Sequence, residues 1–416
     1  MVRAHIQTLA FGMGLSLTIF AAREAGALGC SKFVTYKDVL VCALENDPDV
    51  IRSVYTSEQN ELLPSVAAQR PNPEFGTQLL FGKAGEEKYQ DSLFSFAHTV
   101  ELGGKRDARI LKARANLKIS QSEARLTREQ TYLTTFLTLV RLRQIHNELE
   151  LVDEAIATYG RVQKQFKGRA RLNPEQRVLF KVLATASQGY SLQRISLISE
   201  FNVFQNAIVR STLKNFDAAK ELLPPVKVDW PSSENIVVNA TNSQLDKVKG
   251  ELEVANADLN IEESLAWPDM KLGPSFQFQT QGAQRTSALG LNLSLPLPVF
   301  HRNEAGRAYA EKGIERSNHQ VSAVINEQNR QLLLFKQKYR SSVEALKSST
   351  SFSVLELDHK AIEKDFENGG VPSSLFIESH RQVIDLTKEI NARELDAYDA
   401  LGRILELQGR LLEEGL

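Results

Sequence analysis

Apolar and polar residues alternate with a period of two in two parts of the chain. The sharpest case has a leucine at every second position: Leu289, Leu291, Leu293, Leu295 and Leu297. Such alternation predicts a strand with one face against an apolar environment and the other against a polar one. We predict four strands, at about residues 74–82, 91–102, 271–280 and 287–298. A tilted strand needs roughly nine to eleven residues to cross a bilayer, so these segments are long enough.

Elsewhere the apolar residues recur at steps of three and four, which predicts helices. The pattern continues from residue 107 to about 165 and from about 303 to 366, without a proline in either stretch. At 1.5 Å per residue each helix would reach about 90 Å. Helices of that length pack as coiled coils rather than inside a globular core. Each is followed by a predicted return helix, over residues 173–208 and 372–413.

These elements occur in the same order twice, about 195 residues apart. The repeating unit is helix, strand, strand, very long helix, break and helix. An internal repeat of this kind indicates an architecture before any function is considered. We predict a first repeat over residues 28–221, a proline-containing linker over 222–235 and a second repeat over 236–416.

The N-terminus carries a continuous apolar stretch, residues 9–22, which follows Arg3 and precedes Ala25-Gly26-Ala27. A basic start, a short apolar stretch and an A-x-A site predict a secretory signal peptide over residues 1–27. A retained membrane anchor is the alternative interpretation. With the signal peptide removed, the mature protein would lie outside the cytoplasm.

Two cysteines remain after that cleavage, Cys30 and Cys42. In an oxidising compartment a pair this close usually forms a disulfide, which is the interpretation we favour. The alternative is that Cys30 becomes a lipidated N-terminus, since Leu28 and Gly29 precede it.

Composition and motifs argue against several functional classes. The net charge of −1 gives no electrostatic basis for nucleic-acid binding. The seven histidines are scattered, and the sequence contains no zinc-protease, phosphate-loop or serine-hydrolase motif. We therefore expect no enzymatic activity, no cofactor and no metal site.

Four short motifs, in this order and at this doubled spacing, resemble the TolC family of outer-membrane efflux proteins, closest to its shorter heavy-metal and cation branch. They are Ala43-Leu44-Glu45-Asn46-Asp47-Pro48, Pro71-Asn72-Pro73, Leu102-Gly103-Gly104-Lys105-Arg106 and Leu295-Pro296-Leu297-Pro298-Val299-Phe300-His301-Arg302-Asn303. The resemblance covers essentially the whole mature chain.

The resemblance implies a mainly α fold with a small β portion, assembled as a homotrimer in the outer membrane. Three copies of four strands would complete a β-barrel of about 12 strands in lipid, and the long helical hairpins would continue as a periplasmic α-barrel. A periplasmic adaptor and an inner-membrane pump would be the partners. Open sheet edges cannot persist in lipid, which independently favours closure by further copies.

Three groups of residues are candidates for function. Residues at the rim, where strands pass into helices, are Gly103, Gly104, Arg106, Pro298, Arg302 and Asn303. Arg106 and Arg302 are expected to fix this passage by hydrogen bonds to nearby carbonyls. The residues expected to face lipid are Leu289, Leu291, Leu293 and Leu295.

The third group comprises the two hairpin tips, which the resemblance implies are the periplasmic gate and the adaptor contact. They contain Lys164, Lys167, Gly168, Arg169 and Arg171 in the first hairpin, and Asp365, Glu367, Gly369, Gly370 and Ser373 in the second. Opposite charges on the two tips would form ion pairs between the hairpins. We expect a passive efflux duct; the alternatives are a type I protein-secretion channel and a soluble periplasmic coiled-coil scaffold.

Overall fold

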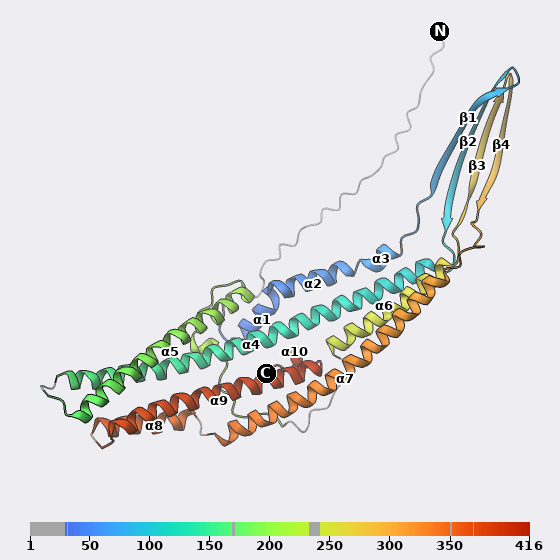
Figure 1. Cartoon of the computed structure of the whole chain (residues 1–416). Helices are drawn as coiled ribbons and strands as arrows, with labels where there is room; N and C mark the ends of the chain where they lie inside the picture. The colour runs from blue at the N-terminus through green and yellow to red at the C-terminus, as the bar shows by residue number, and fades with distance from the viewer. Residues whose placement is uncertain (1–29, 31, 169–170, 233–241, 350–351, 369) are drawn as a thin grey trace, which may run out of the picture.

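The molecule is a long helical rod with a narrow sheet at one end and the ends of two helical hairpins at the other (Figure 1). The computed structural model describes residues 30, 32–168, 171–232, 242–349, 352–368 and 370–416. The predicted signal peptide, residues 1–27, lies outside the described residues, as do residues 233–235 of the predicted linker.

Three short helices lead toward the sheet: α1 (Tyr36–Asn46), α2 (Pro48–Asn60) and α3 (Leu63–Ala67). The carboxylate of Asp47 accepts hydrogen bonds from the backbone N–H groups of Asp49 and Val50, so it caps the start of α2. Pro48 at the first position of α2 has no N–H to leave unpaired. The Asn46-Asp47-Pro48 motif is therefore the junction between two helices.

The sheet has four antiparallel strands in the order β1-β2-β3-β4: β1 (Glu74–Ala84), β2 (Glu87–Val100), β3 (Met270–Gln281) and β4 (Gln284–Ser294). Each hairpin turns through two residues, with Gly85 (φ 68°) and Gly282 (φ 53°) in the left-handed region that glycine adopts readily. The strands predicted at about 74–82, 91–102, 271–280 and 287–298 leave intervals of several residues in each hairpin, but polar residues such as Glu87 and Gln284 within these intervals continue the ladder. The fourth strand was predicted to reach residue 298 but ends at Ser294, before Pro296 and Pro298, which have no N–H to donate.

Two helices form the first hairpin: α4 (Lys105–Lys167) and α5 (Pro174–Thr212). α4 is one unbroken helix of 63 residues, as its pattern predicts. Asn173 caps the returning helix, since its side chain accepts a hydrogen bond from the backbone N–H of Gln176. A short 3₁₀ turn, η1 (Lys220–Leu222), then leads into an extended segment.

The second half of the chain begins with α6 (Ser243–Leu265). After strands β3 and β4, the sequence predicted one helix over residues 303–366. The structure has two, α7 (Glu304–Ser348) and α8 (Phe352–Glu367). The hydroxyl groups of Ser348 and Ser349 donate to the carbonyls of Ala345 and Leu346 at the end of α7. Serine side chains that bond the backbone in this way lower helix propensity, which explains why the helix ends here.

The return helix α9 (Ser373–Leu407) also ends earlier than predicted, and α10 (Leu411–Glu414) follows it. Between them Gly409 has φ 66°, a conformation that terminates a helix.

The core follows α4. Phe136, Leu139 and Leu142 of α4 pack with α1, α5 and Tyr398 of α9 in one apolar cluster, and Leu133 packs with α7 and α9 in another. Toward the hairpin tips, two further apolar clusters join α4, α5 and α9. Among the helices in the described part of the chain, none combines the length and apolar character of a membrane span.

Candidate functional site: sheet, rim and hairpin tips

One face of the sheet is apolar. The register places Leu289, Phe276, Phe94 and Thr77 side by side across all four strands. Rings on this face also meet directly, since the centroids of Phe94 and Phe278 are 6.2 Å apart and those of Phe75 and Phe96 are 5.0 Å apart. Side chains on this face such as Phe278 and Leu289 are exposed within the described chain, so the sheet presents an apolar surface.

The opposite face of the sheet is polar. Gln277 donates a hydrogen bond of 2.8 Å to the carboxylate of Asp91, and the hydroxyl of Tyr89 lies 3.3 Å from the same carboxylate. Asn292 of β4 faces the same way as Gln277, because its partner Gly273 lies four residues from Gln277 along β3, an even step that keeps the same face. The sheet is therefore amphipathic across its thickness.

The predicted lipid-facing leucines belong to the apolar face. Leu289, Leu291 and Leu293 lie on β4 and are strongly exposed, Leu291 at 74%. Leu295 is also exposed and lies just beyond the end of the strand. β4 and β1 are the two edges of the sheet, and each leaves one row of backbone groups unpaired within the described chain.

At the rim, two glycines let β2 pass into α4. Gly103 and Gly104 have φ 74° and 76°, the left-handed region that favours glycine. A Cβ on Gly103 would also lie 2.8 Å from the side chain of Trp267 and 2.9 Å from the carbonyl oxygen of Ser264. Gly103 is thus required both by its backbone conformation and by close contact with the second half of the chain.

Hydrogen bonds from α4 hold the same passage. Arg106 Nε donates a 2.7 Å hydrogen bond to the carbonyl of Ala68 at the end of α3, which is the kind of contact expected from the sequence. The Lys105 ammonium forms a 2.6 Å ion pair with Asp269, just before β3. Arg109 pairs with Glu101 at the end of β2.

The second rim passage uses Asn303 in place of the glycine pair. Asn303 has φ 54° and directly precedes α7, as Gly104 precedes α4. Its side-chain amide donates to the carbonyl and carboxylate oxygens of Glu262 in α6, at 2.8 and 2.6 Å. Arg302 and Pro298 are exposed beside it, and Arg302 makes no hydrogen bond within the described residues, contrary to the role expected for it.

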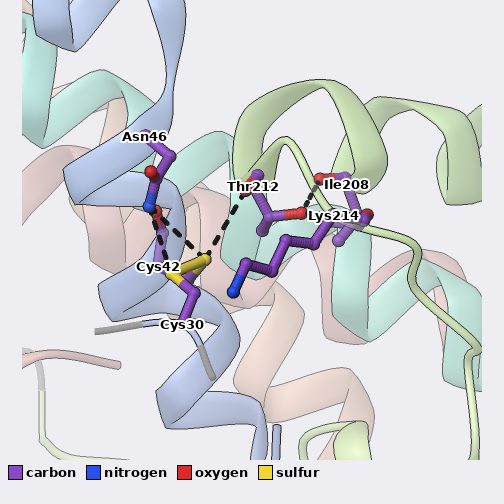
Figure 2. Close-up of a disulfide and its surroundings, with 6 residues drawn as sticks. All are labelled: Cys30, Cys42, Asn46, Ile208, Thr212 and Lys214. Atoms are coloured by element: carbon purple, nitrogen blue, oxygen red, sulfur yellow. Dashed lines mark hydrogen bonds between the residues drawn. A yellow bond between two sulfur atoms is a disulfide. The ribbon is translucent and has the colours of Figure 1, made fainter. Parts of the chain in front are cut away.

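The two cysteines form a disulfide at the start of the described chain (Figure 2). The Asn46 amide donates to the carbonyl of Cys42 at 2.9 Å and lies 3.1 Å from the sulfur of Cys30. The sulfur of Cys42 lies 3.7 Å from the carbonyl of Thr212, the last residue of α5. The disulfide thus fixes the N-terminal segment where α1 meets the end of the first hairpin.

The hairpin tips lie at the end of the rod away from the sheet (Figure 1). Lys164, Lys167, Gly168 and Arg171 of the first tip are exposed, and so are Asp365 and Gly370 of the second. Arg169, Gly369 and the side chains of Glu367 and Ser373 lie outside what the structure describes. Within the described side chains, Asp365, Lys164 and Lys167 form no ion pair.

An ion pair that joins the two hairpins lies about one turn further along the helices. Arg161 of α4 lies 2.8 Å from Glu363 of α8, and Thr158 donates to the same carboxylate at 2.9 Å. The sequence gives the charges but not this pairing, because the break between α7 and α8 sets the register of α8.

A buried aromatic cluster lies next to this ion pair. The ring of Phe376 is 4.1 Å from that of Phe366 and 4.4 Å from that of His380, and Tyr159 contacts both Phe376 and His380. Tyr159, Phe376 and His380 are buried, and the Tyr159 hydroxyl donates to the carbonyl of Ile377 at 3.3 Å. The cluster joins α4, α8 and α9 near the tips. Phe376 and His380 are four residues apart, so they lie on one face of a helix, and this spacing is a sequence signal that could have predicted the cluster.

No group of three or more side chains suited to hold a metal ion occurs among the residues that the structure describes.

No family model matches the chain, and no curated protein matches its sequence. Solved structures match its fold. The open state of the MtrE outer membrane channel of Neisseria gonorrhoeae superposes with a TM-score of 0.70 at 10% identity, over 90% of this chain and 89% of that one. The outer membrane protein VceC of Vibrio cholerae gives 0.65 at 12% identity, over 90% and 96%.

CusC, whose structures concern folding and transmembrane channel formation, gives a TM-score of 0.62 at 11% identity, over 89% of this chain and 92% of that one. The chain therefore has the fold of these outer membrane channels, a helical rod with a small four-stranded sheet. The similarity to CusC is no greater than that to MtrE, so these comparisons do not favour one branch of channels over another.

Proposed function

We propose that this protein is an outer-membrane exit duct of the TolC type, a passive channel of a tripartite efflux system. The observation that carries the proposal is the sheet, whose apolar face is exposed and whose two outer edges, on β1 and β4, are open within the described residues. In lipid an apolar outer face is favourable, and an open edge is not, so the sheet requires both a bilayer and further copies of itself.

A homotrimer meets the second requirement. β4 of one copy would pair with β1 of the next, and the polar face with Asp91, Gln277 and Asn292 would line the lumen. The helical rod has a similar requirement, because a row of apolar side chains along α5 is exposed in the described chain: Val178, Val182, Leu192, Ile195 and Val203. Neighbouring copies would cover this stripe as the α-barrel closes.

The helical part would extend into the periplasm and meet an adaptor and an inner-membrane pump at the hairpin tips. Energy would come from the pump, since a duct of this kind performs no reaction of its own. Its cargo would be small toxic compounds or metal cations. A type I secretion duct has the same fold and remains the second candidate, distinguished by whether a polypeptide or a small solute passes.

The gate would lie at the hairpin tips. We assign the closed contact to Arg161 and Glu363 with the adjacent aromatic cluster, and a secondary role to Asp365 and Glu367. Arg161→Glu should raise the conductance of the isolated channel, and combining it with Glu363→Arg should return conductance toward the wild-type level. If reversing Asp365 and Glu367 raises conductance and the Arg161 variant does not, the gate lies at the outermost turn instead.

The duct itself is tested by two neighbouring substitutions on β4. Leu291→Arg places a charge on the proposed lipid face, which costs about 2–4 kcal/mol at the middle of a bilayer. Asn292→Arg places the same charge on the proposed lumenal face. We expect the first variant to lose membrane-inserted trimer and the second to insert normally and shift ion selectivity in planar bilayers.

Wild-type protein examined by electron microscopy after detergent extraction should appear as a trimeric hollow rod. A protein that stays monomeric without detergent, with both arginine variants equally soluble, would support the periplasmic scaffold and exclude the duct.

A further inference from the structure

A cavity of about 290 Å³ lies where the segment between the two halves of the chain crosses the second hairpin. Its walls come from four places: the extended segment with Val226, Lys227 and Trp230, the end of α7 with Leu346 and Lys347, α9 with Thr387, Ile390 and Glu394, and Arg143 of α4. The cavity is thus built from both halves of the chain, next to the break between α7 and α8.

The lining is apolar on one side. Trp230 packs against Tyr398 with ring centroids 4.7 Å apart, and its side chain lines the cavity together with Ile390 and Leu346. Small-molecule sites combine such an apolar wall with a few convergent polar groups, and this volume is at the small end of their range.

Three polar groups of the lining are buried and incompletely bonded, whereas Lys347 is exposed. Thr387 is 2% exposed, and its hydroxyl oxygen has no hydrogen-bond partner among the described residues. The same holds for Arg143 Nε and for one carboxylate oxygen of Glu394. A buried polar atom without a partner is costly, so a ligand that bonds to Thr387 and Arg143 would gain free energy there.

The charges of the lining select the ligand. Glu394 pairs with Arg143 and also accepts a 2.8 Å hydrogen bond from Gln144, so this carboxylate is neutralised within the protein. Lys227 and Lys347 pair with no carboxylate in the described chain, which leaves the cavity with excess positive charge. The Lys227 ammonium lies 5.6 Å from the Trp230 ring centroid, so a cation stands directly beside the apolar wall. Burial lowers the pKa of Lys227, a cost that a bound anion would offset.

From this arrangement we propose that the cavity binds a small apolar carboxylate, with its hydrocarbon part on Trp230 and Ile390 and its carboxylate facing Lys227, Lys347 and the Thr387 hydroxyl. The site touches the end of α7 and the middle of α9. Occupancy therefore stabilises the segment against the second hairpin. The site goes beyond the duct function and does not depend on it, because it lies outside the sheet and the hairpin tips.

The binding test uses cyclohexanecarboxylate, which is transparent in the near ultraviolet and too short to form micelles. The chain has two tryptophans, so the Trp267→Phe variant reports on Trp230 alone. We expect a saturable change in Trp230 fluorescence with Kd on the order of 1 mM, the range for so small a ligand. Ligand-observed saturation-transfer NMR on the wild-type protein should give the same affinity.

Two comparisons test the chemistry. Cyclohexanecarboxamide, which has the same shape without the charge, should bind at least about tenfold more weakly. Lys227→Gln with Lys347→Gln should weaken the acid by a similar factor and leave the amide unchanged, whereas Lys249→Gln, an exposed lysine on α6, should change neither.

Thr387→Val provides a second variant in case the double lysine variant folds poorly, and it should weaken the acid several-fold. Equal binding of acid and amide, tighter binding of cyclohexylmethylammonium, or no saturation by either readout would overturn the proposal. None of these outcomes bears on the duct, which is tested at β4.

Discussion

The two long helices that leave the sheet differ in how the rest of the chain surrounds them. α4 continues unbroken for 63 residues, of which 22 are buried, whereas α7 spans 45 residues with only six buried. α4 packs against α1, α2, α5, α6 and α9, while α7 packs mainly against α6 and α9. The comparison teaches that α4 is the internal axis of the folded chain and that α7 lies toward its outside.

The largest expected difference comes from truncating one leucine in each helix. Leu142 of α4 is completely buried, so Leu142→Ala should lower the free energy of unfolding by about 2–5 kcal/mol. Leu333 of α7 is 69% exposed, so Leu333→Ala should cost less than about 1 kcal/mol in a single chain. Chemical denaturation of detergent-solubilised protein measures both.

The outcome also sharpens the comparison. If Leu333→Ala proves as costly as Leu142→Ala and the loss is accompanied by dissociation, the outside of α7 is covered by another copy of the chain.

Two glycine-to-alanine substitutions, one before α4 and one within α7, should change the free energy of unfolding in opposite directions. Gly103→Ala, two residues before α4, combines a positive φ with a clash against Trp267 and Ser264, and should destabilise by about 1–3 kcal/mol. Gly313→Ala, inside α7 with open space around it, should stabilise by about 0.5–1 kcal/mol. Thermal unfolding of the two variants would show shifts of opposite sign; shifts of the same sign would contradict this account of the rim.

A buried carboxylate gives α4 a pH dependence that α7 should lack. Burial raises the pKa of Glu129 above its ordinary value of 4.5. The carboxylate also pairs with Arg125 at 3.2 Å. An acid whose pKa is raised in the folded state destabilises the fold once the pH exceeds the unfolded value, and this penalty disappears as the pH falls through the folded pKa.

Glu129→Gln should therefore raise the melting temperature at pH 7, and its advantage over the wild type should shrink toward pH 4. Glu327→Gln in α7 provides the control. Glu327 is partly exposed and the hydrogen bond from Arg330 lowers its pKa, so that variant should show no stabilisation at neutral pH. An advantage of Glu129→Gln that stays constant with pH would contradict the role given to burial.

The smallest effect concerns the break that separates α7 from α8. Replacing Ser348 and Ser349 by alanine removes the two hydroxyls that bond back to the helix and should favour continuation by a few tenths of a kcal/mol per residue. Hydrogen exchange of the amides that follow should slow in the double variant. Unchanged exchange would mean that tertiary packing, rather than local propensity, ends α7.

The sequence predicted those elements whose cause is local. Alternating leucines predicted the position and facing of β4, and an uninterrupted helical pattern predicted α4. The serines at the end of α7 carried a local signal that was overlooked. The two-residue turns at Gly85 and Gly282 were missed because polar residues look the same in a long loop and in an exposed strand.

Features that depend on contacts between distant segments could not be predicted in the same way. The pairing of Arg161 with Glu363 depends on the register between α4 and α8, and the need for glycine at position 103 depends on Trp267 from the other half. The sequence pattern alone predicts which face of a helix is apolar. Which residue pairs with a given charged side chain depends on how the helices pack.

The pairing of β2 with β3 has a consequence for the order of events when the protein is made. Each hairpin closes through two residues, but the central pair joins residues such as Phe94 and Phe276, more than 180 positions apart. Contacts of such long range form slowly, because a large loop must close before they stabilise anything. As the chain is synthesised from its N-terminus, the β1–β2 hairpin is made first. Its apolar face and open edges stay exposed until the β3–β4 hairpin has been synthesised. Aggregation at that stage is the hazard that any chaperone accompanying this chain would have to prevent.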